Sequence, residues 1–291
     1  MTAATAAEPQ LGLAVSTIGR PALKHLLQSA AESTRPPDVV VIANQSGTRL
    51  DLENQSYPFE LRVISSAGGV SVGRNDAVAA MGDAIDVLGF PNDHSSYPES
   101  SLAEVMECFA GINPPSVVAC SLTDPVQPRL PMPPRGSHLD RTTAWRAIEP
   151  ATFVRREAFV AAHAFRTDLG TGCHTPWQSG EGTDLLLRLI AAKHTLISRP
   201  DIVVIGNSSD DEMLTRALIR KHRGYARGTG FVYRIHGYPP AAKARLVLAP
   251  WIRLSSLHDS YGTAVKICAA RSLGRLEGLL GRTVGAPLSP W

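Results

Sequence analysis

The chain has 291 residues, enough for one large α/β domain or for one domain with an appendage. Its hydrophobic fraction of 44% and charged fraction of 19% are those of a globular protein, which excludes a largely disordered chain. The sequence contains no apolar core of a signal peptide and no run of about 18–20 apolar residues. A secreted leader and a membrane-spanning helix are therefore not expected.

Charge is distributed unevenly along the chain. Residues 1–211 contain 16 basic and 23 acidic residues, a net charge of −7, whereas residues 212–291 contain 13 and 3, a net charge of +10. Basic segments of this kind usually contact anionic surfaces or ligands. The four cysteines show no metal-ligand spacing, which indicates reduced thiols and a cytoplasmic location.

The first part of the chain alternates apolar runs with helical periodicity. A strand at 11–17, a helix at 22–33 and a strand at 39–43 form a βαβ unit. A strand at 61–65 and the Gly-rich stretch 65–76 precede a helix at 72–81 and a strand at 84–90. This order predicts an α/β fold with a mostly parallel sheet and helices on both faces.

The rest of the chain continues this alternation and then becomes mainly helical. We expect these elements: helix 101–110, strand 116–122, surface loop 123–137, strand 151–154, helix 156–164, helix 184–192, strands 195–198 and 202–205, and basic helices 212–225, 241–257 and 261–280. The predicted organisation is a loose tail (1–9), an α/β domain (10–211) and a basic, mainly helical C-terminal region (212–291).

Polar side chains follow the strand that ends near Phe90. Asn92, Asp93 and His94 come directly after it, and ligands of open α/β sheets bind outside the carboxyl ends of the strands. Asp93 and His94 are able to hold a divalent cation. An Asn-Asp pair after a strand also occurs as a simple turn, so this motif alone leaves both interpretations open.

Two further segments carry candidate functional groups. Glu181 and Asp184 open the helix at 184–192, where they serve either as a catalytic base or as acidic residues that stabilise a helix N-terminus. The Gly-rich segment 68–76 places Arg74 at a helix start, where it is able to meet a phosphate. That segment is neither the dinucleotide fingerprint nor a Walker motif.

Four segments in this order resemble the family-two glycosyltransferases, an inverting group with the GT-A fold. They are AVSTIGRPALKHLLQS (14–29), GGVSVGRNDAV (68–78), GFPNDHSSYP (89–98), and FRTDLGTG (165–172) followed by SGEGTDLLLRL (179–189). The resemblance extends from about Leu11 to Phe231. It implies a sugar transfer from a nucleotide diphosphate sugar to an acceptor hydroxyl, in cell-envelope or exopolysaccharide synthesis.

The resemblance also implies roles for individual residues. Donor contacts are expected from Thr17, Arg20, Asn44, Arg74, Asn75, Asn92 and Asp93. Asp93 and His94 are expected to bind Mn²⁺ or Mg²⁺, and Glu181 or Asp184 to act as the base, with Glu181 nearer the usual base position. His174 and Trp177 are acceptor candidates, although Trp177 equally suits a packed core position.

The sequence departs from the family pattern at the metal and base motifs. Asn92 and His94 occupy the two Asp positions of Asp-x-Asp, and Gly182 stands where the usual catalytic Asp would be. Asn207 lies near the place where some relatives have a metal-binding His. We favour an active enzyme with shifted ligands, and the alternative is a catalytically silent nucleotide-sugar-binding protein.

The basic C-terminal region allows several interpretations. Residues 216–240 form either a loop that closes over the diphosphate or a solvated basic helix. The helix at 261–280 has apolar and basic residues that suit a membrane surface, a homodimer or packing on the α/β domain. A lipid-linked or other glycan acceptor fits a protein on the inner face of the membrane. No nucleic-acid-binding module is recognised, so nucleic acid is not expected as a partner.

Overall fold

The computed structural model describes residues 8–52, 56–124, 127–206, 215–252 and 261–284. The chain forms two compact units, which are described separately. Unit 1 comprises the described parts of Met1–Ala67, Val72–Ala164 and Leu185–Ser208, and unit 2 those of Gly68–Ser71, Phe165–Asp184 and Ser209–Trp291. The predicted boundary between residues 211 and 212 stays a prediction, and Asn207 lies outside the described residues.

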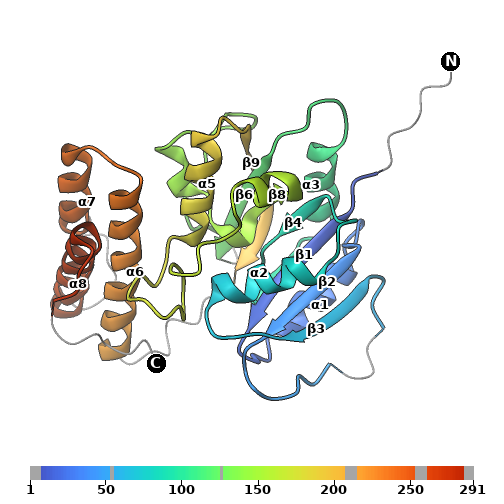
Figure 1. The fold of residues 1–291 in the computed structure, drawn as a ribbon, viewed down its shortest axis with the longest axis horizontal. Helices are drawn as coiled ribbons and strands as arrows, with labels where there is room; N and C mark the ends of the chain where they lie inside the picture. Colours follow the sequence, from blue (N-terminus) through green and yellow to red (C-terminus); the bar gives the residue numbers. More distant parts are fainter. Residues whose placement is uncertain (1–7, 53–55, 125–126, 207–214, 253–260, 285–291) are drawn as a thin grey trace. The chain divides into compact units, whose positions relative to one another are not determined.

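Unit 1 contains the sheet and most of its flanking helices (Figure 1). Its elements are β1 (Leu11–Thr17), α1 (Leu23–Ala31), β2 (Val39–Asn44), β3 (Glu60–Ser65), β4 (Val87–Gly89), β5 (Ser95–Ser96), α3 (Ser101–Phe109), β6 (Val117–Asp124), β7 (Gln127–Pro128), β8 (Thr152–Arg155), α4 (Arg156–Ala161) and β9 (Leu196–Gly206), with short 3₁₀ turns at Thr143–Arg146 and Glu149–Ala151. Two helices cross the boundary between the units: α2 (Val70–Ala80) and α5 (Glu181–Ala191).

The sheet is mixed, with the strand order β3-β2-β1-β4-β8-β6-β9-β5 and β7 paired to β6. The pairs among β3, β2, β1 and β4 are parallel, so these strands end at the same edge. β8 runs antiparallel between β4 and β6. The predicted opening βαβ unit and the α/β class are therefore confirmed.

Apolar side chains of β1 show why helices cover both faces of the sheet. Leu13 and Val15 point to the face packed by α1 and α3, where they belong to one buried cluster with Leu26 and Leu102. On the opposite face, a Cβ added at Gly12 would lie 2.6 Å from the sulfur of Met81, directly after α2. The alternation of side chains along β1 thus serves two helical layers.

The two predicted strands near residue 200 are a single strand, so that prediction is wrong. The pairing of β9 with β6 shifts register between Cys120 and Ser121, where β9 contains extra residues. Pro200 lies in this bulge, and its carbonyl oxygen accepts a hydrogen bond of 2.9 Å from the Ser121 hydroxyl. From sequence alone, a bulge inside a continuous strand is therefore read as the end of one strand and the start of another.

Unit 2 contains three long helices, α6 (Thr215–Ile235), α7 (Pro240–Ile252) and α8 (Tyr261–Leu280). None of the described helices carries an apolar stretch of the length that a bilayer crossing takes. The sequence left open whether residues 216–240 form a closing loop or a basic helix. Residues 216–235 belong to helix α6. The first residues of the predicted helix 212–225 and the last of the helix 241–257 lie outside the described residues.

Helices α6 and α8 pack closely because glycines face the neighbouring backbone. A Cβ at Gly274 would collide with the carbonyl of Arg223, and one at Gly278 with the carbonyl of Arg227. Glu277 lies between these glycines with a side chain that is 0% exposed. Its carboxylate accepts hydrogen bonds from Arg223 (2.6 Å), Arg227 (2.7 Å) and the Val284 amide (2.7 Å).

The ion-pair triad of Glu277, Arg223 and Arg227 predicts that the stability of α6 and α8 depends on pH. Burial by itself raises the pKa of Glu277, but hydrogen bonds from Arg223, Arg227 and the Val284 amide outweigh it and bring the pKa down to about 2. The stabilisation is thus complete above the ordinary Glu pKa of about 4.3 and is lost as the pH falls towards 2. We expect Glu277→Gln to lower the free energy of opening of α6 and α8 by about 3–5 kcal/mol at neutral pH.

Amide hydrogen exchange of α6 and α8 measures this change directly. The control is Glu157→Gln, whose pair with Arg155 involves a side chain that is 67% exposed and is expected to contribute about 0–1 kcal/mol. Equal protection in the wild type and Glu277→Gln would contradict the role of the triad.

Candidate functional site

A polar cluster lies at the carboxyl ends of β1 and β4 in unit 1. We call Thr17, Arg20, Asp93 and His94 the strand-end cluster. The Thr17 hydroxyl donates a hydrogen bond of 2.7 Å to Asp93 Oδ2, and His94 Nδ1 lies 3.1 Å from Asp93 Oδ1. An Arg20 guanidinium nitrogen lies 3.8 Å from the same Oδ1 atom. The fold therefore brings together four predicted site residues from two segments, 14–29 and 89–98.

The backbone explains why these side chains meet. Residues Ser16 and Asn92 form an isolated parallel bridge, which extends the alignment of β1 and β4 beyond Gly89. Asp93 consequently lies beside Thr17, and its side chain is only 7% exposed. A buried carboxylate requires hydrogen-bond donors, and the Thr17 hydroxyl supplies one of them.

Asp93 and His94, the expected cation ligands, lie close enough together to share one ion. Their Oδ1 and Nδ1 atoms are 3.1 Å apart, a hydrogen-bond distance, so in this structure the two groups contact each other. The described residues contain no group of three His, Cys, Asp or Glu side chains placed to hold a metal ion. Mg²⁺ commonly takes one or two carboxylates together with phosphates and water, which Asp93 satisfies, whereas an imidazole such as that of His94 is a nitrogen ligand in place of the usual oxygen. Arg20 lies 3.4 Å from His94 Nδ1, but its side chain is 51% exposed and is able to turn aside.

Arg74 supports the end of β4 from within unit 1. Its side chain is among the most buried in the protein, at 2% exposure, and its guanidinium donates hydrogen bonds of 3.1 Å to Phe90 O and to Asn92 Oδ1. These contacts hold the residues before Asp93 in place. The structure therefore gives Arg74 contacts that position the strand end.

The remaining donor candidates lie outside the strand-end cluster. Asn44 closes the turn after β2, because its side-chain amide donates 2.7 Å to Thr48 O and its oxygen accepts 3.0 Å from the Ser46 amide. This is an Asx turn, a local role for the residue from which the resemblance implies a donor contact. Asn75 is half-buried on α2.

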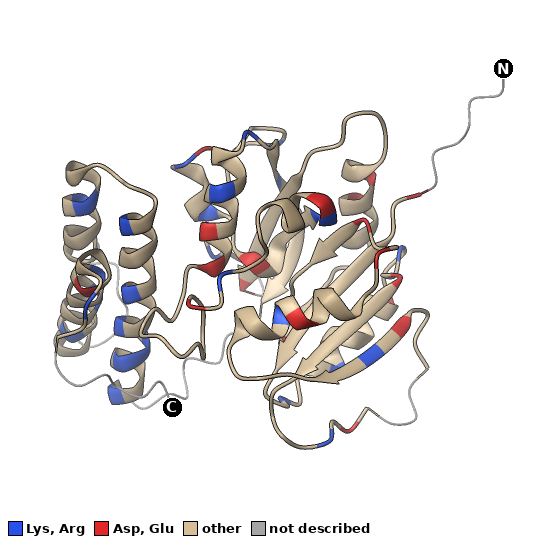
Figure 2. Cartoon of the chain, viewed as in Figure 1, with Lys and Arg blue, Asp and Glu red and all other residues tan. Residues whose placement is uncertain are grey.

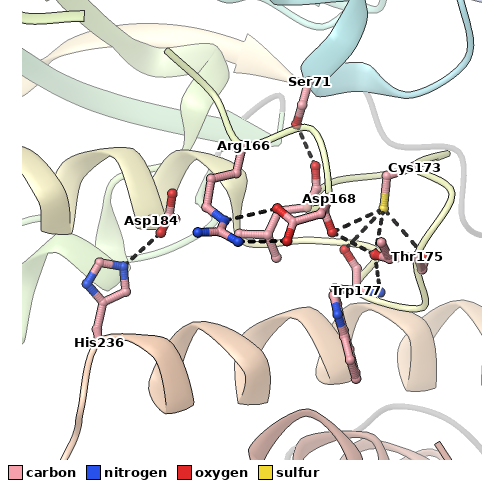
Figure 3. Close-up of polar contacts among 9 residues, drawn as sticks. Ser71, Arg166, Asp168, Cys173, Thr175, Trp177, Asp184 and His236 are labelled. Carbon is pink, nitrogen blue, oxygen red and sulfur yellow. Dashed lines mark hydrogen bonds and ion pairs between the residues drawn. The ribbon is translucent and has the colours of Figure 1, made fainter. Parts of the chain in front are cut away.

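In unit 2, Glu181 begins α5 beside a glycine with a special backbone conformation. Gly170 has a φ of +109°, and a Cβ there would lie 3.1 Å from Glu181 Cδ and 2.8 Å from Ser71 Oγ. The Ser71 hydroxyl donates 2.6 Å to Leu169 O (Figure 3). Gly170, in the segment FRTDLGTG, thus leaves room for the Glu181 carboxyl group. Glu181 as a whole residue is 7% exposed.

Asp184 has a partner that the sequence did not reveal. His236, the residue after α6, places Nε2 2.8 Å from Asp184 Oδ1 (Figure 3). Asp184 is 1% exposed, so the contact satisfies a buried carboxylate. The two residues are 52 positions apart and follow no spacing rule, so the sequence offers no signal for this pair.

The acceptor candidates differ in their surroundings. Trp177 is 8% exposed and stacks on Phe231, with ring centroids 4.8 Å apart and an interplanar angle of 6°. This contact favours the packing interpretation of Trp177. His174 is exposed, whereas the neighbouring Cys173 is buried, and burial raises the pKa of the Cys173 thiol.

The fold is that of known glycosyltransferases. Mannosyltransferase PcManGT from Pyrobaculum calidifontis, solved with GDP-Man and Mn²⁺, matches with a TM-score of 0.64 and 17% identity over 94% of this chain and 88% of its own. S. aureus TarS 1-349 in complex with UDP-GlcNAc matches with a TM-score of 0.56 and 12% identity, covering 94% and 92%. The chain spans 55% of the longer TarS structure. No protein-family model and no curated protein sequence matches.

The Asp184–His236 contact predicts a cost when the imidazole is removed. We expect His236→Ala to lower the free energy of opening at the start of α5 by about 1–3 kcal/mol, because a buried carboxylate loses a hydrogen-bond donor. His236→Gln keeps an amide donor and is expected to recover part of this loss. Hydrogen exchange of the α5 amides provides the measurement.

His174→Ala is the matched control, since that histidine is exposed in the same unit and its change is expected to stay within about 0.5 kcal/mol. If His236→Ala and His174→Ala gave the same protection, Asp184 would not depend on His236.

Proposed function

We propose that this protein is a glycosyltransferase that moves a sugar from a nucleotide diphosphate sugar to an acceptor hydroxyl with inversion. The observation that carries the proposal is the strand-end cluster, at the carboxyl edge of parallel strands in a glycosyltransferase fold. PcManGT is described with GDP-Man and Mn²⁺, and TarS with UDP-GlcNAc, which supports a donor of this class. Cell-envelope or exopolysaccharide glycan synthesis in the cytoplasm is the setting we propose.

On the donor side, Arg20 and the residues after β4 contact the diphosphate. Asp93 and His94 would hold a divalent cation, and a bound Mn²⁺ or Mg²⁺ supplies positive charge that stabilises a departing diphosphate. Arg20 adds a further cation at the same edge of the sheet. Thr17 and Asn44 frame the base, Asn75 contributes a polar contact, and Arg74 acts indirectly by fixing Asn92.

On the acceptor side, Glu181 takes the proton of the attacking hydroxyl. The acceptor oxygen then bonds to the anomeric carbon while the bond from that carbon to the diphosphate oxygen breaks, which inverts the anomeric centre. Asp184 is the weaker candidate for the base, because it is 1% exposed and bound to His236. We assign to Asp184 the role of positioning the first turn of α5, and to His174 an acceptor contact.

A catalytically silent nucleotide-sugar-binding protein is the second candidate. Gly182 favours it, because this residue stands where related enzymes have the catalytic carboxylate. The two candidates share the donor site and differ in whether Glu181 carries out proton transfer. Separate measurements of binding and turnover distinguish them.

The metal assignment predicts a cation-dependent change in nucleotide binding. Titration calorimetry with UDP and with GDP is expected to show tighter binding when Mn²⁺ is present, and Asp93→Asn should remove this gain. Arg20→Ala should weaken binding with and without Mn²⁺, since its charge acts independently of the ion. Asp201→Asn, a change at a carboxylate paired with Arg199 elsewhere in unit 1, serves as the control. A Mn²⁺ gain that survives Asp93→Asn would refute the assignment.

The base assignment predicts a loss of turnover without a loss of binding. Glu181→Gln keeps the shape of the side chain, so donor binding should hold while nucleoside diphosphate release falls about 10²–10⁴-fold. Release is measured with a panel of nucleotide sugars and Mn²⁺, using Glu157→Gln as the matched surface control. Full turnover in Glu181→Gln would remove Glu181 from the mechanism. Donor binding without turnover in the wild type, across the panel, would support the silent protein.

A further inference from the structure

Helices α7 and α8 expose large apolar side chains to solvent. Eight of the twelve exposed large apolar side chains among the described residues lie between residues 215 and 284. On α7 they are Leu248 (60% exposed), Trp251 (42%) and Ile252 (75%), and on α8 they are Leu276 (44%) and Leu280 (48%). We call these five residues the apolar stripe. Such a concentration marks an interaction surface more often than single exposed residues do.

The stripe is one surface because its members follow helical spacing and the two helices are in contact. Residues 248, 251 and 252 share one face of α7, as residues 276 and 280 do on α8. The Trp251 indole donates a hydrogen bond of 3.0 Å to Ser272 Oγ, one turn before Leu276. Ser272 in turn donates 2.7 Å to Val247 O. Trp251 of α7 therefore borders the face of α8 that carries Ser272 and, one turn later, Leu276.

The charge around the stripe has one sign. Within 215–252 and 261–284 the single acidic residue is Glu277, whose side chain is 0% exposed and bound by two arginines. Arg245 on α7 and Lys266 on α8 are exposed. In Figure 2 these helices carry Lys and Arg positions in blue. The exposed charge of these described helices is thus entirely positive.

We propose that α7 and α8 dock on an anionic lipid surface. The apolar stripe would enter the boundary between head groups and acyl chains, and Arg245 and Lys266 would contact lipid phosphates. A second copy of the chain would oppose positive charge with positive charge, which disfavours a symmetric dimer through this face. This inference concerns a membrane partner and does not require sugar transfer.

Co-sedimentation of the full chain with lipid vesicles tests the proposal. We expect the chain to bind phosphatidylcholine vesicles that contain about one third phosphatidylglycerol. This binding should weaken with added salt and should be much weaker with phosphatidylcholine alone. Leu248→Asn combined with Ile252→Asn should reduce partitioning by at least about tenfold. Arg245→Gln and Lys266→Gln should each reduce it about fivefold on the anionic vesicles.

Ile112→Asn combined with Val160→Asn is the matched control, because both side chains are exposed and apolar (95% and 59%) in unit 1. Circular dichroism and thermal unfolding of each variant show that it is folded, so the outcome of this test does not depend on whether the chain binds nucleotides. Equal sedimentation of the stripe variants and the wild type would overturn the proposal. So would a dimer, seen by sedimentation equilibrium, that the stripe variants dissociate.

Discussion

A buried carboxylate has to be supplied with hydrogen-bond donors or cations, and the candidate site is arranged around this requirement at Asp93. The Thr17 hydroxyl at the end of β1 donates a hydrogen bond to the Asp93 carboxylate, because the parallel pairing of β1 and β4 continues to residue 92. Arg74 donates hydrogen bonds to Phe90 O and Asn92 Oδ1 and so fixes the residues that precede Asp93. The half-exposed Arg20 is the member of the strand-end cluster with the most freedom to move, so a ligand that reaches this edge meets a fixed carboxylate and an adjustable cation.

Unit 2 satisfies its buried carboxylates in ways that separate their roles. Glu277 is bound by two arginines, which carry a permanent charge, and this fits a structural ion pair between helices. Asp184 is bound by an imidazole. Glu181 lies against the bare Cα of Gly170, a position that depends on a backbone conformation suited to glycine. We assign the chemistry to Glu181 because it lies nearer the usual base position of the family that the sequence resembles.

Sequence named Thr17 and Asp93 as candidates at the ends of apolar runs, and parallel strands end at one edge of a sheet. Their direct contact was not predicted, because it depends on the parallel bridge between Ser16 and Asn92. Sequence was insufficient where residues meet across a large separation in the chain. Nothing near His236 indicates Asp184, and nothing near Gly228, which lies inside α6, indicates that a Cβ there would collide with the Ser179 backbone. Pro200 likewise suggested a strand end because a bulge and a break share the same residues.

The basic C-terminal region shows why a charge count overstates the charge available to a partner. Arg223 and Arg227 neutralise Glu277, and Arg275 donates 2.7 Å to Leu246 O, so these cations are committed within the helices. On α7 and α8, Arg245 and Lys266 remain exposed on the same helices that expose the apolar stripe, and α6 additionally exposes Arg216, Arg220 and Arg234. A soluble diphosphate would need the cations alone, whereas a lipid surface uses both features. The combination is therefore better explained by a membrane partner than by donor binding.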